Sequence, residues 1–366
     1  MEKDKISTQQ LAFMIFLLLI GSALVYVPGN TAGQDAWITT VLGAFPGLFV
    51  LYAVLKLNSM YPGQRISAIS TIVLGKWPGT VLNILFAWGV FQFFVGLFYE
   101  FFILMQTIYP GTPRIIFNPL LILVGVYCLY KGINPLFRLG ELLLFMTIIF
   151  IILGFAISLP NMYFSRLSPV LSTWKPLAAG VLYASDWPFD EMVMLGLFLP
   201  LVSDLKNKTR LLYKWYLLSA LVLVLSTIEV VAILGSEMIQ LYQIPLFQVY
   251  RTSGFAQFKG LEVFFMVLWF FSGMYAIFLY YQGFNFILQD IFTLKDYKSL
   301  IIPVGLCVVV FTLYMFPSDI DYRLMGFKYI PLYTFLSNLF YPAILLLAAV
   351  IRKKTSKTTA ADLISN

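Results

Sequence analysis

Three acidic residues lie within six positions of the otherwise apolar segment Leu182–Glu191: Asp186, Asp190 and Glu191. An ionised aspartate at the centre of a membrane helix costs about 2.5–3.5 kcal/mol on insertion scales. Three such groups must therefore face an aqueous cavity, hold protons or pair with a cation, unless the segment is a re-entrant surface loop in water. Pro188 removes a helical N–H in their midst, which predicts an interruption of the helix.

A second interruption is predicted at Gly21-Ser22, inside the apolar stretch 8–28. A half-helix that begins after Gly21 would present the free N–H groups of Ser22, Ala23 and Leu24. Its dipole would favour an anion by up to ~2 kcal/mol, so a ligand carboxylate is expected there. The alternative is that the small residues only form a notch for helix packing.

Two further apolar stretches, 79–109 and 260–292, carry polar residues at helical spacing. In the first, Gln92, Gly96 and Tyr99 share one face that either lines a cavity or packs, and Glu100 is a candidate for proton or ligand coupling. In the second, Ser272 offers a single hydroxyl, so a sodium site is only weakly encoded. The candidate ligand-binding residues are Gly21, Ser22, Ala23, Leu24, Gln92, Gly96, Tyr99, Glu100, Tyr183, Ala184, Ser185, Asp186, Trp187, Phe189, Glu191, Ser272 and Tyr275.

Enzymatic chemistry is not expected. The chain has no histidine and two cysteines, so His-based triads, His-ligated zinc sites and CxxC motifs are absent from the sequence. A diaspartyl intramembrane enzyme needs two aspartates on facing helices, whereas Asp186 and Asp190 lie on one segment. No cofactor and no metal is predicted.

The elements that must position these residues are membrane helices. The chain is 60% hydrophobic and 11% charged, against about 25% charged in a soluble domain. A spanning helix needs about 20 mostly apolar residues. Ten stretches qualify: 8–28, 36–57, 79–109, 114–130, 136–159, 176–203, 210–234, 260–292, 299–316 and 329–351.

The distribution of basic residues predicts the orientation of these spans. With a cytoplasmic N-terminus, 17 of the 24 Lys and Arg residues fall inside and 7 outside. Both termini are therefore expected in the cytoplasm. The net charge of +7 then reflects topology and attraction to anionic lipid rather than nucleic-acid binding.

The two interruptions fall in the first and sixth spans, five spans apart. Because five is odd, the two halves would insert in opposite orientations, which is typical of inverted-repeat transporters with a binding site at the midplane. We predict one transmembrane domain, 1–351, with repeats over 8–159 and 176–351, followed by a cytoplasmic tail, 352–366. The outer segment Gly235–Ser253 is expected to be a lid or an interfacial helix.

Short motifs in a fixed order are shared with a known family. They are Ile6-Ser7-Thr8-Gln9-Gln10, Ile20-Gly21-Ser22-Ala23-Leu24, Gln34-Asp35-Ala36-Trp37-Ile38, Tyr61-Pro62-Gly63, Leu74-Gly75-Lys76-Trp77, Arg166-Leu167-Ser168-Pro169-Val170-Leu171, Pro188-Phe189-Asp190-Glu191 and Phe316-Pro317. Over nearly its whole length the chain resembles the B subunits of nutrient germinant receptors of spore-forming bacteria, in the amino acid–polyamine–organocation transporter superfamily. It departs from them at Asp190, where the family often has glycine.

This resemblance implies an all-α integral membrane protein with ten helices in a leucine-transporter-type 5+5 inverted repeat, broken in helices 1 and 6. It also implies a larger membrane A subunit and a lipoprotein C subunit as partners, in the inner membrane of the dormant spore. The expected function is to bind a small nutrient, an amino acid or a sugar, and to trigger germination. The alternative is a proton-coupled amino-acid transporter with Glu100, Asp186 or Glu191 as the proton carrier.

Overall fold

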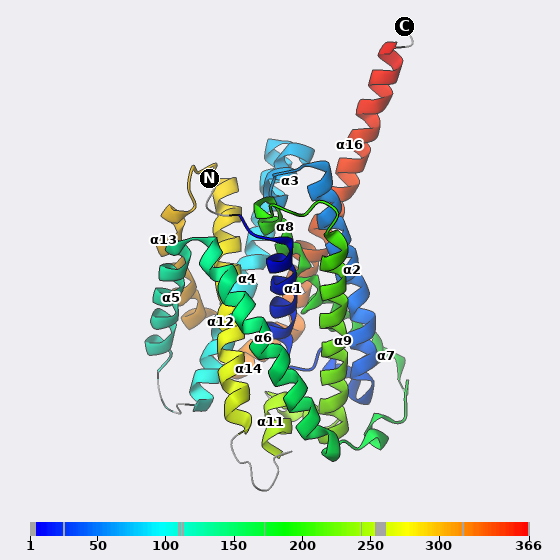
Figure 1. The fold of residues 1–366 in the computed structure, drawn as a ribbon, viewed down its shortest axis with the longest axis vertical. Coiled ribbons are helices and arrows are strands. Elements are labelled where there is room, and N and C mark those ends of the chain that lie inside the picture. The colour runs from blue at the N-terminus through cyan, green and yellow to red at the C-terminus, as the bar shows by residue number, and fades with distance from the viewer. Residues whose placement is uncertain are drawn as a thin grey trace.

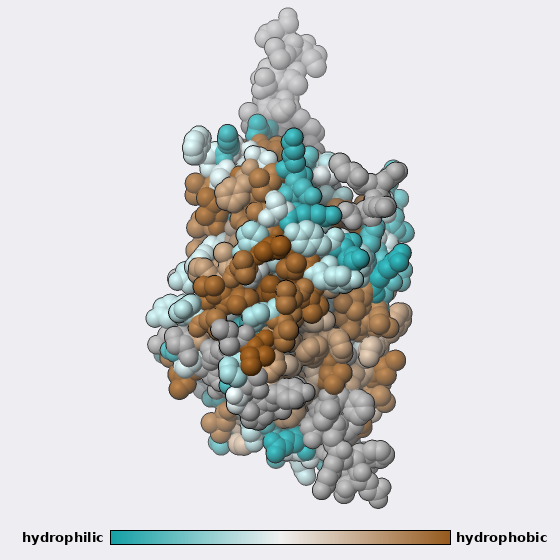
Figure 2. Space-filling model, turned by 90° about the vertical axis from the view of Figure 1, so that its left-hand side faces the viewer, coloured by the Kyte–Doolittle hydropathy of each residue, from teal (hydrophilic) through white to brown (hydrophobic). Residues whose placement is uncertain are grey.

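The computed structural model describes residues 5–24, 26–108, 111, 113–171, 173–242, 244–252, 261–316 and 318–364, and this part of the chain is almost entirely helical (Figure 1). Within it, the extended segments make one isolated bridge, between Ile6 and Val202. Both ends of the chain lie at the upper end of the molecule in Figure 1. Figure 2 shows hydrophobic residues gathered across the middle of the visible face, with hydrophilic residues mainly above and below them.

The helices divide into long, short and single-turn elements. The long ones are α2 (Ala36–Met60), α4 (Lys76–Ile108), α6 (Ile133–Ser158), α9 (Thr209–Leu234), α12 (Leu261–Ile291), α13 (Lys298–Met315) and α16 (Tyr341–Ile364). The shorter ones are α1 (Thr8–Ala23), α3 (Ile66–Leu74), α5 (Arg114–Lys131), α7 (Trp174–Asp186), α8 (Leu195–Phe198), α10 (Met238–Leu241), α11 (Pro245–Thr252), α14 (Asp319–Lys328) and α15 (Ile330–Thr334). The 3-10 turns are η1 (Asn30–Asp35), η2 (Leu159–Asn161), η3 (Phe164–Leu167), η4 (Phe189–Met194) and η5 (Leu199–Leu201), and η6 (Phe335–Phe340) is a π-helix.

Seven helices in the described residues are long and apolar enough to cross a membrane, and each overlaps one of the ten predicted spans. The other three predicted spans differ for local reasons. The first gives a helix of only 16 residues, the fourth gives a short apolar helix over Ile116–Lys131, and the sixth is divided among α7, η4, α8 and η5. The number ten thus stays a prediction.

The first predicted interruption is wrong in its position and its polarity. The helix α1 continues through Gly21 and Ser22 to Ala23, and the Leu24 N–H bonds the Ile20 carbonyl at 3.0 Å. The N–H groups that would have held an anion are therefore used inside the helix. At this point α1 presents its C-terminus, which is the partially negative end of the helix dipole. The side chain of Ser22 lies outside the described residues.

The second predicted interruption is confirmed. The helix α7 ends at Asp186, and Trp187 adopts an extended backbone with φ −144° and ψ 127°. Proline disfavours a helical conformation in the residue before it, which explains why the helix ends at this position. The chain then resumes as the 3-10 helix η4 and the short helix α8.

Helix α2 packs closely against the interruption through two glycines. A Cβ on Gly43 would lie 2.7 Å from the Ala184 Cβ, and one on Gly47 would lie 2.4 Å from the Phe189 carbonyl oxygen. The Tyr216 hydroxyl of α9 donates to the Ala44 carbonyl at 2.6 Å in the same place. Since any side chain at these glycines would push the segments apart, the glycines fix where the interrupted segment lies.

The C-terminal end of this segment is joined to the N-terminal part of the chain. Asp204 accepts bonds from the backbone N–H of Thr8 at 2.6 Å and its hydroxyl at 2.9 Å, and pairs with Lys208 at 2.5 Å. Next to this cluster, the Ile6 N–H donates to the Leu201 carbonyl at 3.0 Å. The start of α1 and the end of the interrupted segment are therefore held together.

This cluster predicts a specific acid dependence of stability. Hydrogen bonds from Lys208 and from the Thr8 backbone lower the pKa of Asp204 from 3.8 to about 2. A carboxyl whose pKa is lower in the folded state stabilises the fold when the pH is above its pKa in the unfolded state. That stabilisation is lost as the pH falls toward its pKa in the folded state, here from about pH 4 to about pH 2. In detergent, the melting temperature of the parent chain should therefore fall more steeply over this range than that of Asp204→Asn. Asp296→Asn, an exposed acid elsewhere, is the control; equal slopes in all three chains would contradict the prediction.

Candidate functional site

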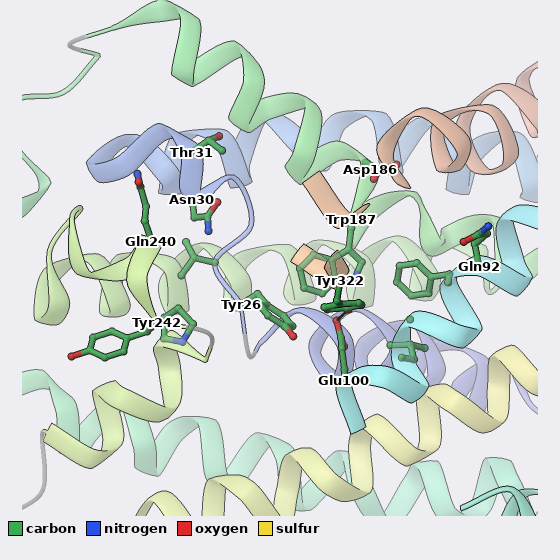
Figure 3. Close-up of a pocket in the computed structure, with 16 residues that line it drawn as sticks. Tyr26, Asn30, Thr31, Gln92, Glu100, Asp186, Trp187, Gln240, Tyr242 and Tyr322 are labelled. Atoms are coloured by element: carbon green, nitrogen blue, oxygen red, sulfur yellow. Dashed lines mark hydrogen bonds between the residues drawn. The ribbon is translucent and has the colours of Figure 1, made fainter. Parts of the chain in front are cut away.

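A cavity of about 500 Å³ lies beside the interruption of the α7 segment (Figure 3). Residues from five regions line it: the chain after α1, the middle of α4, the end of α7, the segment of α10 and α11, and α14. They are Tyr26, Val27, Asn30, Thr31, Gln92, Phe93, Gly96, Leu97, Glu100, Asp186, Trp187, Gln240, Tyr242, Pro245, Tyr322 and Gly326. The volume suits a small organic molecule.

Glu100 is one of two carboxyl groups in the lining. Its Oε1 accepts a hydrogen bond from the Tyr322 hydroxyl of α14 at 2.6 Å, and the Tyr26 hydroxyl also bonds this carboxyl. The ring of Tyr322 stacks on Tyr99 with centroids 4.7 Å apart. Two tyrosines from distant parts of the chain therefore hold Glu100 in place at the cavity wall.

Asp186 is the second carboxyl group in the lining and is the last residue of α7. The Thr334 hydroxyl of α15 donates to its Oδ1. The neighbouring Trp187 indole meets the Tyr26 ring edge-on, with centroids 5.3 Å apart. In the view of Figure 3, Trp187 and Tyr322 lie between Asp186 and Glu100.

The other two acids of the predicted cluster lie behind the cavity wall. Asp190 is 1% exposed and Glu191 is fully buried, and both belong to η4. The side chain of Asn338 in the π-helix η6 lies near Asp190, and that of Tyr280 in α12 lies near Glu191. Neither carboxylate oxygen of Asp190 has a hydrogen-bond partner among the described residues. Among the described residues, no group of three or more His, Cys, Asp or Glu side chains is arranged to hold a metal ion.

Five predicted site residues line the cavity: Gln92, Gly96, Glu100, Asp186 and Trp187. The others with described side chains lie outside its lining: Gly21, Ala23, Leu24, Tyr99, Tyr183, Ala184, Ser185, Phe189, Glu191, Ser272 and Tyr275.

Several of these residues have packing roles instead. Gly21 packs against α12, where its carbonyl accepts from the Trp269 indole at 3.2 Å and an added Cβ would lie 3.1 Å from the Ser272 carbonyl oxygen. Ser185 donates to the Val181 carbonyl at 2.6 Å within its own helix. Tyr275 packs against Gly140. The notch alternative for Gly21 is therefore the one that the structure favours.

The stripe on α4 is rotated from the predicted one. At about 100° per residue, Gln92, Gly96 and Glu100 follow one another by steps of about 40° around the helix. Phe93 and Leu97 continue this arc, and both line the cavity. Tyr99 falls about 20° beyond Gln92 on the other side, which explains why it packs on aromatic rings instead.

Sequence reasoning missed the lining residues from outside the predicted helices. Asn30 and Thr31 lie in η1, and Tyr322 lies in α14, between two predicted spans. Gln240 and Tyr242 belong to the segment expected to be a lid or an interfacial helix. Of these regions, only Gly235–Ser253 had a sequence pattern that pointed to the site, namely the apolar residues around Pro245.

One more buried carboxyl lies away from the cavity lining and serves as a reference. Glu229 of α9 is 3% exposed and accepts from the Ser158 hydroxyl of α6 at 2.6 Å. It resembles Glu100 in being a buried carboxyl that accepts a hydroxyl hydrogen bond of 2.6 Å, although Glu100 is bonded by a second hydroxyl, that of Tyr26.

A model of the spore germination protein family matches residues 5–320 of the chain. Three relatives from Bacillus subtilis (strain 168) match almost end to end. Spore germination protein KB is 29% identical, covering 97% of both chains; protein A2 is 26% identical over 96% of this chain and 97% of the relative; protein YndE is 23% identical over 97% and 99%.

The fold is similar to that of a solved transporter. The structure of Mhp1, a nucleobase-cation-symport-1 family transporter in a closed conformation with bromovinylhydantoin bound, matches with a TM-score of 0.60. The match covers 88% of this chain and 75% of Mhp1 at 12% sequence identity, so it speaks for the fold alone.

Two glycines of the predicted site should respond in opposite ways to the same substitution. An added Cβ at Gly96 meets nothing within 4 Å, whereas at Gly21 it meets the α12 backbone. Gly21→Leu should therefore destabilise the protein by about 1–3 kcal/mol through overpacking. Gly96→Leu should leave the melting temperature equal or higher, because leucine favours a helix over glycine by up to about 1 kcal/mol and the cavity has room. Thermal unfolding in detergent measures both; equal destabilisation would mean that the cavity is closed in solution.

Proposed function

The chain belongs to the spore germination protein family, and on that premise we propose that it is the nutrient-sensing subunit of a germinant receptor. It binds a small molecule in the cavity between Glu100 and Asp186 and passes a conformational change to partner subunits. The observation that carries this proposal is the cavity itself, which opens where α7 is interrupted and where five predicted site residues converge.

The finer architecture is part of the proposal. Ten membrane helices in two inverted repeats of five, of the leucine-transporter type, are supported by the likeness to Mhp1 and by the interruption of the sixth predicted span. The ligand would lie at the midplane, and the segment of α10 and α11 would close the outer side, since Gln240, Tyr242 and Pro245 line the cavity. Following the family resemblance, the partners are the A and C subunits and the location is the spore inner membrane, with both termini on the core side.

Sensing requires that the ligand bind one conformation better than another. Residues from both halves of the chain meet at the cavity: Glu100 of the first half is bonded by Tyr322 of the second, and Asp186 belongs to the second half. A ligand between these carboxyls therefore contacts groups whose relative positions depend on how the two halves are packed. Ligand binding between the two carboxyls can therefore change how the two halves of the chain are packed.

The second candidate function is proton-coupled transport of an amino acid, which the transporter fold and the buried acids favour. The two functions differ in net flux. Purified protein in liposomes should bind the ligand without accumulating it if the chain is a sensor. Uptake driven by a proton gradient, and lost in Gly96→Leu, would instead establish the transporter.

Binding to the cavity predicts the behaviour of two variants with matched chemistry. The purified full-length chain is heated with a panel of amino acids and sugars, and a specific rise in melting temperature identifies a ligand. Asp186→Asn and Glu100→Gln should each weaken its binding by about tenfold or more, since a hydrogen bond to a charged group contributes about 1.5–3 kcal/mol. Glu229→Gln removes a similarly buried carboxyl outside the cavity lining and should leave the affinity unchanged. If all three variants bind equally well, the ligand site lies elsewhere.

A further inference from the structure

We infer that the cavity selects a small organic ammonium compound, and that it discriminates against a free carboxylate and against a neutral sugar. This inference rests on the proposed function and names the ligand class of that same site. It replaces the expectation of a ligand carboxylate at α1, which required a helix to begin after Gly21, whereas α1 continues to Ala23.

The side chains in the described lining that can become charged near neutral pH are both acids. The lining includes the carboxyls of Glu100 and Asp186, and no lysine or arginine is among its residues. The ion pairs of the described residues, Arg65–Asp290 and Lys208–Asp204, involve neither carboxyl. An ionised carboxylate away from water is costly unless a cation pairs with it. A ligand with a positive charge supplies that pairing, and a ligand carboxylate adds to the unfavourable charge.

Two helix ends add to this negative potential. The helix α1 ends at Ala23, and Tyr26 and Val27, which follow it, line the cavity. The helix α7 ends at Asp186, which itself lines the cavity. Both helices therefore direct their C-terminal, partially negative ends toward the site, where the dipole favours cations by about 0.3–1 kcal/mol at exposed positions and more where buried.

Aromatic rings complete the recognition of an ammonium group. Tyr26, Trp187, Phe93 and Tyr322 lie on the cavity wall together with the two carboxyls. An ammonium group over such faces gains about 0.5–2 kcal/mol, the higher value where water is excluded. A neutral sugar would stack on the same rings but would leave the charge of the carboxylates uncompensated.

The remaining polar groups suit a neutral acceptor on the same ligand. In Figure 3, Asn30, Thr31 and Gln240 lie together at one end of the cavity, away from Glu100 and Asp186. The buried Thr31 hydroxyl oxygen has no hydrogen-bond partner. Such neutral groups meet an amide or hydroxyl oxygen well, but they do not balance a carboxylate as arginine does. The volume of about 500 Å³ and the aromatic wall also favour an organic cation over a bare metal ion.

The test compares matched compounds on two carbon skeletons. The purified full-length chain is titrated at about pH 6.5, where an α-amino group is protonated. The small series is L-alaninamide, L-alanine, propionamide and propionate. The large series is L-phenylalaninamide, L-phenylalanine, hydrocinnamide and hydrocinnamate. Glucose represents neutral sugars, and potassium chloride represents inorganic cations. Dissociation constants come from thermal shift and calorimetry.

In at least one series, the ammonium amide should bind about tenfold or more tightly than the amino acid of the same skeleton, and the neutral amide and the acid should bind more weakly still. In Glu100→Gln and Asp186→Asn the affinity for the ammonium amide should fall toward that of the neutral amide. Glu229→Gln should keep the selectivity of the parent chain, and Gly96→Leu should lose binding of every compound.

Each other outcome overturns the inference in a distinguishable way. If an amino acid or glucose binds at least as tightly as the ammonium amides, and Gly96→Leu abolishes that binding, the cavity is the ligand site but its proposed selectivity is wrong. If potassium chloride alone stabilises the chain through the two carboxyls, the site is for an inorganic cation. If no compound of any class binds, the proposed function fails, and the selectivity fails with it.

Discussion

The rest of the site depends on one constraint, the close packing of α2 against the interrupted segment at Gly43 and Gly47. An interruption leaves backbone groups without helical partners, and inside a membrane such backbone is tolerated only where protein buries it or where it lines a cavity. Here the α2 glycines allow helix backbone to approach Ala184 and Phe189 directly. The interruption is thus enclosed on the α2 side, while Asp186 and Trp187 line the cavity.

The acids beside the interruption are held by residues from the C-terminal part of the chain. The Thr334 hydroxyl donates to Asp186 and the Tyr322 hydroxyl of α14 donates to Glu100, while the Asn338 side chain lies near Asp190. The π-helix η6 packs closely against α4 at this place. A Cβ added to Gly89 of α4 would lie 2.1 Å from the hydroxyl oxygen of Ser337, the residue before Asn338. A π-helix is a frequent device at functional sites, since it redirects side chains within an otherwise regular helix.

The polarity of the helix ends connects this architecture with function. A transporter-like fold with interrupted helices can offer an N-terminus to an anion or a C-terminus to a cation. In this chain α1 and α7 both present their carbonyl ends near the cavity, whereas α11 begins at the lining residue Pro245. Together with two carboxyls, the ends of α1 and α7 make a site whose charge is complementary to a donor or a cation. The sensing function proposed from the family membership and the ligand class proposed from the charges both depend on Glu100 and Asp186 in the cavity lining.

The sequence by itself determined the class of protein, the interruption before Pro188 and part of the cavity wall. These features are local: apolar length predicts a membrane helix, proline removes a helical donor, and helical spacing places Gln92 and Gly96 on one face. The family was also legible, because short motifs keep their order along the chain. Only the tertiary structure decided that α1 passes through Gly21 and ends at Ala23, that Tyr99 supports Tyr322 from behind, and that Asn30, Gln240 and Tyr322 close the cavity. These positions depend on packing between helices that are far apart in the sequence, as in the bond from Tyr322 to Glu100, whose sequence separation is 222 residues. No local pattern of residue types specifies that packing.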